Sequence, residues 1–242
     1  MALLRNSLAA AAAAAIVSGV LTAAPAAASA DTAHARSLGP QLTSSNWVGY
    51  VTNGGTYTSV EASWVQPTMN CGSGDGDAVF WIGLDGWGSS TVEQDGTRGQ
   101  CIIGRAVYSA WWETYPTNPI TSFSDTVRPG DQFYSKIAYQ GNGVYDMVLQ
   151  NKTEGWTEHI TPSGAAGASN SSAEVVAEAP SAGSREPLAD FGTVHFSGSM
   201  ANGSTFGNAN AQKVDMVQNG TVDATPTELT GGTDFAIDWQ HL

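Results

Sequence analysis

The sequence predicts an all-β fold, a two-sheet sandwich or a barrel, and three observations carry this prediction. Runs rich in β-branched and aromatic residues recur along the chain after residue 30. These runs are short and are separated by Gly, Asn, Asp, Ser and Pro, the residues that favour turns. A helical hydrophobic period of about 3.6 residues is nearly absent from the same part of the chain. Many short strands joined by turns are typical of a sandwich or a barrel.

The first segment of the chain is not expected to belong to this fold. Residues 1–30 carry one basic residue, Arg5, then an Ala-rich apolar run, and end in the small-x-small pattern Ala28-Ser29-Ala30. This is the pattern of a secretory signal peptide, so we expect a secreted, extracellular protein. Residues 31–44 are expected to form an N-terminal segment that is a candidate for a short trimmed pro-region. No linker rich in Pro or Ser divides the remainder, so residues 45–242 are expected to be a single domain.

Residues 162–172 are poor in apolar side chains and are expected to form a loop. Examples of the expected strands are 46–51, 60–65, 78–84, 106–115, 132–140, 144–151, 173–179, 192–198 and 213–218.

Alternation along 173–179 separates two faces of that strand. Every second residue from Ala173 to Ala179 is small and apolar, so this face should pack in the core. Glu174 and Glu178 point from the other face, which is either solvent-exposed or the floor of a groove.

The stretch TVEQDGT at 91–97 crowds Glu93, Gln94 and Asp95 in front of a glycine. On pattern alone this is an exposed strand end that leads into an Asp-Gly turn. Gln94 shares a face with Val92, whereas Glu93 and Asp95 point away and are expected to be solvated.

Charge and cysteine content narrow the choice of partners. The chain has 22 acidic and 9 basic residues and a net charge of −13, so it should repel nucleic acid and anionic membranes. Its two cysteines, Cys71 and Cys101, are expected to form one disulfide in an exported chain. No metal and no cofactor are expected, because two cysteines at this spacing are no zinc signature and the four histidines show no ligand spacing. The eight tryptophans suggest a concave aromatic surface for a polymer, although burial explains any one of them.

Seven ordered motifs resemble those of one family, the eqolisins, a family of glutamic peptidases. Together they cover most of residues 45 to 200. The motifs are SNWVGYV, SWVQPT, FWIGLDG, TVEQDGT, AVYSAWWETYP, AEVVAEAP and ADFGTVHF.

The resemblance implies an antiparallel two-sheet β-sandwich, concanavalin-like and bent to leave a substrate groove. It also implies an acid endopeptidase that acts on proteins or peptides with no metal and no covalent intermediate; a monomer is the default. By position, Gln94 and Glu178 match the catalytic pair, and Glu174 is expected to be structural. Residues expected to support the site or line the groove are Trp47 with its neighbour Asn46, Trp81, Asp85, Trp111 and Glu113.

The chemistry of this pair explains how it could cut a peptide. An ionised Glu178 could take a proton from water as the water attacks, and then pass it to the leaving nitrogen. Gln94 is neutral at every pH, so its amide could donate to the oxyanion and hold the water. The chain departs from the family pattern at Ser109, where the family run has Asp, and at Val175, where a larger apolar residue is common.

A secreted β-sandwich that binds glycans or hydrolyses glycosides is the alternative, since paired carboxyls and tryptophan-lined grooves also suit sugars. A serine hydrolase and a metallopeptidase are poorly supported, because the chain lacks G-x-S-x-G in the required setting and lacks H-E-x-x-H.

Overall fold

The computed structural model describes residues 41–181 and 184–241. The predicted signal peptide and most of the predicted N-terminal segment lie outside these residues. The described residues hold sixteen strands and one short 3₁₀ helix, η1 (Cys71–Ser73). The strands are β1 (Leu42–Ser44), β2 (Trp47–Asn53), β3 (Ser59–Val65), β4 (Gly76–Asp85), β5 (Val92–Ile102), β6 (Arg105–Tyr115), β7 (Asn118–Ser122), β8 (Gln132–Gly141), β9 (Val144–Asn151), β10 (Trp156–Ile160), β11 (Ser172–Glu178), β12 (Thr193–Ala201), β13 (Ser204–Thr205), β14 (Gln212–Gln218), β15 (Thr221–Pro226) and β16 (Phe235–Trp239).

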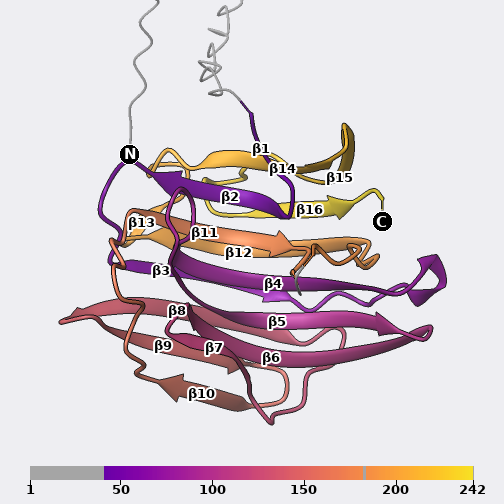
Figure 1. The fold of residues 1–242 in the computed structure, drawn as a ribbon, viewed down its shortest axis with the longest axis horizontal. Helices are drawn as coiled ribbons and strands as arrows, with labels where there is room; N and C mark the ends of the chain where they lie inside the picture. Colours follow the sequence, from indigo (N-terminus) through magenta and orange to yellow (C-terminus); the bar gives the residue numbers. More distant parts are fainter. Residues whose placement is uncertain (1–40, 182–183, 242) are drawn as a thin grey trace, which may run out of the picture. The chain divides into compact units, whose positions relative to one another are not determined.

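Fourteen of the described strands form one hydrogen-bonded path that folds back on itself into two facing layers, while β1 pairs with β14 and β13 with β12 off this path (Figure 1). The order is β10-β9-β8-β3-β12-β16-β15-β14-β2-β11-β4-β5-β6-β7, and neighbours along it are antiparallel. Hydrogen bonds cross from one layer to the other: Trp64 Nε1 on β3 donates to Thr97 Oγ1 on β5, at 2.9 Å. The predicted all-β antiparallel sandwich is confirmed.

The hydrophobic core lies between the two layers. Every second residue of β11 from Ala173 to Ala177 belongs to this core, as predicted. The even-numbered residues of β4, including Phe80 and Ile82, also belong to it. Opposite them, Trp64 stacks on Phe133 with ring centroids 5.6 Å apart. Burial of such large side chains stabilises each layer against the other.

The predicted turn at Asp95-Gly96 is wrong. Strand β5 runs straight through these residues, and Gly96 pairs with Trp81 of β4. A Cβ on Gly96 would lie 2.2 Å from the carbonyl oxygen of Phe80 and 2.7 Å from Cβ of Trp81. The glycine therefore makes room for close packing against Trp81 and does not end the strand.

The predicted solvation of Glu93 and Asp95 is also wrong. Their side chains point into the core between the layers, with exposed fractions of 0 % and 1 %. Asp95 accepts a hydrogen bond from Ser135 Oγ of β8, and Glu93 accepts one from the backbone N–H of Ala165. Burial raises the pKa of Asp95 to about 8 and that of Glu93 to about 7, despite these bonds.

The predicted disulfide is confirmed, because Cys71 in η1 is bonded to Cys101 near the end of β5. The predicted loop at 162–172 is confirmed except for its last residue, which begins β11. No helix in the described part of the chain is long and apolar enough to cross a membrane.

Candidate active site

The outer face of the layer β14-β2-β11-β4-β5-β6-β7 carries most of the predicted site residues. Strand register fixes this arrangement, since directly paired residues share a face. Glu178 pairs with Trp47 of β2 on one side and with Val79 of β4 on the other. Two residues along β4, Trp81 pairs with Gly96, and Gln94 of β5 pairs with Glu113 of β6.

A second apolar cluster covers part of this face and excludes water from it. Its buried members include Trp81 and Trp111 together with Val176, and Trp47 packs against them. The ring of Trp47 meets that of Trp81 edge-on, with centroids 4.8 Å apart. An aromatic surface of this kind lowers the local dielectric and strengthens charge interactions at its polar groups.

Glu178 is a half-buried carboxyl held by donors on both oxygens. Asn46 Nδ2 donates to Oε1 at 2.9 Å, and Trp81 Nε1 donates to Oε2 at 3.0 Å. Burial raises the pKa of Glu178 to about 7, and the charge of Glu113 adds to the rise. Hydrogen bonds from Trp47, Trp81 and Asn46 act in the opposite direction. The carboxyl therefore keeps its proton in mildly acidic solution.

Gln94 is fixed by its neighbour across the strand pair. Its Nε2 donates to Oε2 of Glu113 at 2.7 Å, and only 6 % of the residue is exposed. Burial raises the pKa of Glu113, and the bond from Gln94 opposes the rise. The buried Oε1 of Gln94 has no hydrogen-bond partner among the described residues. The amide thus has an unused acceptor and, because Nε2 carries two hydrogens, a second N–H to donate.

Asp85 lies apart from this pair, at the end of β4, with a backbone φ of 65°. Its carboxylate accepts from the backbone N–H groups of Ser169, Asn170 and Ser171 and from two of their hydroxyls. With five donors its oxygens are fully engaged. Asp85 therefore organises the loop before β11.

Glu174 and Glu113, two acidic residues near Glu178 and Gln94, differ in how deeply they are buried. Glu174 is fully buried, and burial raises its pKa well above the ordinary value, so no atom is exposed to meet a substrate. Glu113, which sequence reasoning placed only near the site, holds the amide of Gln94 directly. Its place opposite Gln94 follows from the β5–β6 register, which the sequence alone does not give.

Among the described residues, no three His, Cys, Asp or Glu side chains lie in an arrangement that could hold a metal ion. The polar groups of this face are instead a carboxyl with a raised pKa and a fixed neutral amide. A buried carboxyl with a raised pKa beside a fixed amide on an aromatic face is the kind of arrangement found in hydrolases.

The particular family follows from the comparison with protein families. The model described as the Peptidase A4 family matches residues 45–239. The chain therefore belongs to this family, the eqolisins, and is a glutamic-type peptidase. This membership leaves no support for the glycan-binding or glycosidase alternative.

Solved structures with the same fold include three peptidases. Scytalido-glutamic peptidase, solved with a transition state analog inhibitor, has a TM-score of 0.70 at 22 % identity, with 81 % of this chain and 98 % of that chain covered. SCP-B, an eqolisin in complex with the tripeptide Ala-Ile-His, gives 0.66 and 21 % over 81 % and 98 % of the chains. Aspergilloglutamic peptidase from Aspergillus niger gives 0.61 and 27 % over 68 % and 99 %. A search of curated proteins finds no match.

Proposed function

We propose that this protein is a secreted acid endopeptidase that hydrolyses peptide bonds in proteins through Glu178 and Gln94. The observation that carries the proposal is the placement of Glu178. Its carboxyl is held between Asn46 and Trp81, its pKa is raised to about 7, and it shares one face with Gln94. A carboxyl with these properties carries a proton in acid and can exchange it during a reaction.

A protonated Glu178 can transfer protons through its two oxygens in one concerted step. As water attacks the scissile carbonyl carbon, its proton passes to the unprotonated oxygen of the carboxyl while the proton already on Glu178 passes to the peptide nitrogen. The C–N bond then breaks, the negative oxygen becomes the carbonyl of the new carboxylic acid, and the amine leaves. The carboxyl ends the cycle protonated, as it began, so a protein with a pKa near 7 at this group would be active below that pH.

Gln94 supplies the stabilisation of charge. Its second N–H can donate to the developing oxyanion, while its unpaired Oε1 can accept from the attacking water. Glu113 holds the amide in one orientation by accepting from Nε2. Because no reorientation is then required during the reaction, the donor stabilises the transition state fully.

Export and chain organisation belong to the same proposal. Residues 1–30 would direct secretion and be removed, residues 31–44 would include any trimmed pro-region, and residues 45–242 would be the peptidase domain, acting as a monomer without a cofactor. N-terminal sequencing of the secreted protein measures the cleavage points directly.

The activity is tested on a denatured protein substrate at about pH 4 and about pH 7.5, with pepstatin and EDTA present. We expect cleavage only in acid, and a fall in kcat/KM of at least about 10³-fold in Glu178→Gln. The matched control is Glu228→Gln, which removes an exposed carboxyl. Cleavage by Glu178→Gln at the wild-type rate, with both variants folded, would exclude Glu178 from the chemistry.

A further inference from the structure

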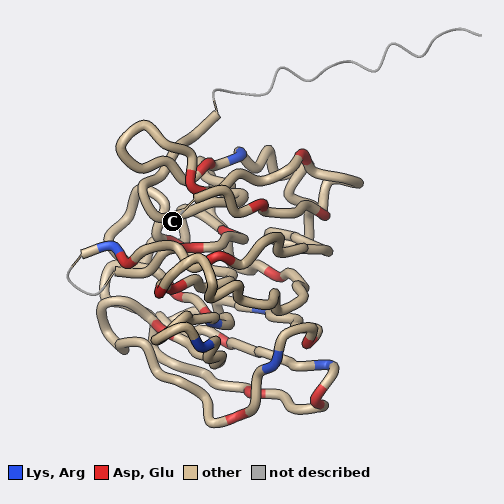
Figure 2. The backbone as a smooth tube through the Cα atoms, turned by 90° about the vertical axis from the view of Figure 1, so that its right-hand side faces the viewer, with Lys and Arg blue, Asp and Glu red and all other residues tan. Residues whose placement is uncertain are grey.

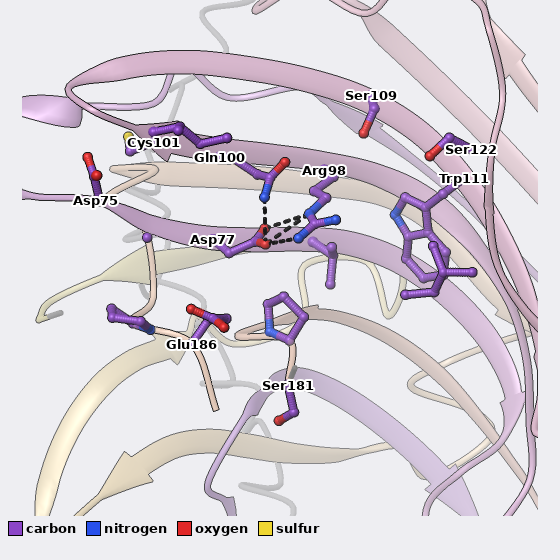
Figure 3. Close-up of a pocket in the computed structure, with 16 residues that line it drawn as sticks. Asp75, Asp77, Arg98, Gln100, Cys101, Ser109, Trp111, Ser122, Ser181 and Glu186 are labelled. Atoms are coloured by element: carbon purple, nitrogen blue, oxygen red, sulfur yellow. Dashed lines mark hydrogen bonds and ion pairs between the residues drawn. The ribbon is translucent and has the colours of Figure 1, made fainter. Parts of the chain in front are cut away.

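A cavity of about 590 Å³ opens on the same face as Glu178 and Gln94, further along β4, β5 and β6 (Figure 3). Its lining includes Val79, Arg98 and Trp111, and Pro180 lies two residues beyond Glu178. Neither Glu178 nor Gln94 lines it. The cavity is therefore a neighbour of the site and has a chemistry of its own.

Arg98 and Asp77 form an ion pair in the floor of this cavity. The carboxylate of Asp77 is 3 % exposed and accepts from Nε and Nη2 of Arg98 and from Nε2 of Gln100. These three donors saturate it and offset its charge. The side chain of Arg98 is 32 % exposed, and within the part of the chain that the structure describes its guanidinium donates to Asp77 from Nε and Nη2, which leaves Nη1 to donate elsewhere.

Trp111 adds a second donor without an acceptor. Its Nε1 is buried and has no hydrogen-bond partner within residues 41–181 and 184–241. Figure 3 shows this nitrogen on the side of the ring that faces Arg98, with Ser109 and Ser122 above the gap. A buried N–H without an acceptor destabilises the folded state, and a ligand oxygen placed here would supply the missing acceptor.

We propose that this cavity is a subsite for a carboxylate of the substrate peptide, held by Nη1 of Arg98 and Nε1 of Trp111. The carboxylate is either an Asp or Glu side chain or the C-terminal carboxylate, which present the same chemistry. The inference rests on the proposed peptidase function and adds a specificity to it. Donors that face each other without an acceptor leave room for an oxygen anion, and guanidinium and indole N–H groups both suit a carboxylate.

Strand register places the subsite along the substrate. Arg98 pairs with Val79, and Val79 pairs with Glu178, so Arg98 lies two strands away in the same row. Two strand spacings amount to about 10 Å, and an extended peptide advances about 3.3 Å per residue. The recognised carboxylate is therefore two to three residues from the bond that is cut.

Two acidic side chains at the cavity, Asp75 and Glu186, act against this preference. Asp75 accepts from the backbone N–H groups of Ile103 and Gly104, so part of its demand for donors is met within the chain. If these acids dominated, a lysine in the substrate would be preferred instead. The experiment must therefore compare both signs of charge.

The substrates are peptides with one cleavable bond that differ only in Glu, Gln or Lys at the positions two and three residues to either side. A second pair ends at these positions with a free carboxylate or an amide. At about pH 5 we expect kcat/KM about tenfold higher for Glu than for Gln at one position, or for the free acid than for the amide, and these two arms tell the sources apart. The preference should shrink below about pH 4, where the carboxyl of the peptide becomes protonated.

The double variant Asp77→Asn/Arg98→Gln removes the ion pair without leaving one buried charge alone. We expect it to lose the tenfold preference and to cleave the Gln peptide within about twofold of the wild type. The control Arg128→Gln/Glu154→Gln removes a surface ion pair and should keep the preference. If the first double variant does not fold, Ser109→Ala/Ser122→Ala leaves the ion pair intact and should reduce the preference about threefold.

Three results would overturn the subsite: equal rates for Glu and Gln at every position together with equal rates for acid and amide, a preference for Lys, or a preference that survives in folded Asp77→Asn/Arg98→Gln. Failure of the peptidase function looks different, because the wild type would then cleave none of the peptides, including the neutral Gln peptide.

Discussion

Glu178, the proposed catalytic acid, shows how burial sets the pKa of a single carboxyl. Three side chains, Trp47, Trp81 and Asn46, offer it hydrogen bonds that favour ionisation, yet its pKa is raised to about 7. Burial among indoles outweighs the bonds, because desolvation penalises the charged form of the whole carboxyl. Trp81 therefore affects the pKa of Glu178 in both directions. Its Nε1–H donates to the carboxyl, which lowers the pKa, and its ring is part of the apolar surface around the carboxyl, which raises it.

Gln94 is the proposed hydrogen-bond donor to the oxyanion. In Gln94→Ala we expect kcat to fall by about 10²–10³-fold with little change in KM, since an oxyanion donor acts mainly in the transition state. The control is Gln140→Ala, an exposed amide on β8. A rate loss confined to KM would mean that Gln94 binds substrate and takes no part in stabilising the transition state.

Residue-level prediction from sequence succeeded and failed on the same stretch. Alternation correctly separates Gln94 from Glu93 and Asp95, but it does not say which face is buried. Polar character suggested that the two acids are solvated, whereas Glu93 and Asp95 lie in the core. The partners that make this burial tolerable, the N–H of Ala165 and the hydroxyl of Ser135, come from distant segments that no local pattern identifies.

Among the elements, β5 contributes residues both to the proposed site and to the interior. Its outer face presents Gln94, Arg98 and Gln100, and its inner face presents Glu93 and Asp95. Both of its neighbours, β4 and β6, are paired along its whole length. Strand type and alternation were predictable here, but the length was not, because Gly96 appeared as a turn residue when its role is close packing. The edge strands β7 and β10 were missed, since short polar strands carry a weak signal.

Asp85, at the end of β4, is expected to stabilise the fold through the loop that it holds. Asp85→Ala should lower the free energy of unfolding by roughly 3 kcal/mol, because five donors in Ser169–Ser171 lose a buried acceptor. Activity at low temperature should stay within about threefold of the wild type, as Asp85 does not contact the proposed pair. Asp146→Ala, which removes a surface hydrogen bond to His159, is the control. Denaturant unfolding together with kcat/KM on one peptide measures both effects, and a large loss of rate without loss of stability would contradict this role.

Acidic residues are distributed over the described part of the chain, with few basic residues among them (Figure 2). Several are buried, and this decides how stability depends on pH. In the folded protein the pKa of Asp95 is about 8 and those of Glu93 and Glu178 are about 7. In the unfolded chain such groups titrate near pH 4. Between these values the folded state binds more protons than the unfolded state, so the free energy of unfolding falls as pH rises.

We therefore expect the melting temperature to be highest near or below about pH 4 and to fall as pH rises through 7 to 8. Thermal unfolding followed by circular dichroism at several pH values measures this. Asp95→Asn keeps an acceptor for Ser135 and cannot ionise, so at about pH 8 it should melt roughly 5–10 °C above the wild type, with little difference in acid. A wild-type melting temperature that rises from acid to neutral pH would contradict the burial of these charges.

The raised pKa values of Glu178 and of the core acids lie in one range, near 7 to 8. A single rise of pH would thus remove the proton that the proposed mechanism requires and, at the same time, place charges inside the sandwich. Molecules carried from acidic into neutral surroundings would lose the proposed activity and also become easier for other proteases to degrade. The pH of the surroundings would then limit where this peptidase acts, and no inhibitor would be required.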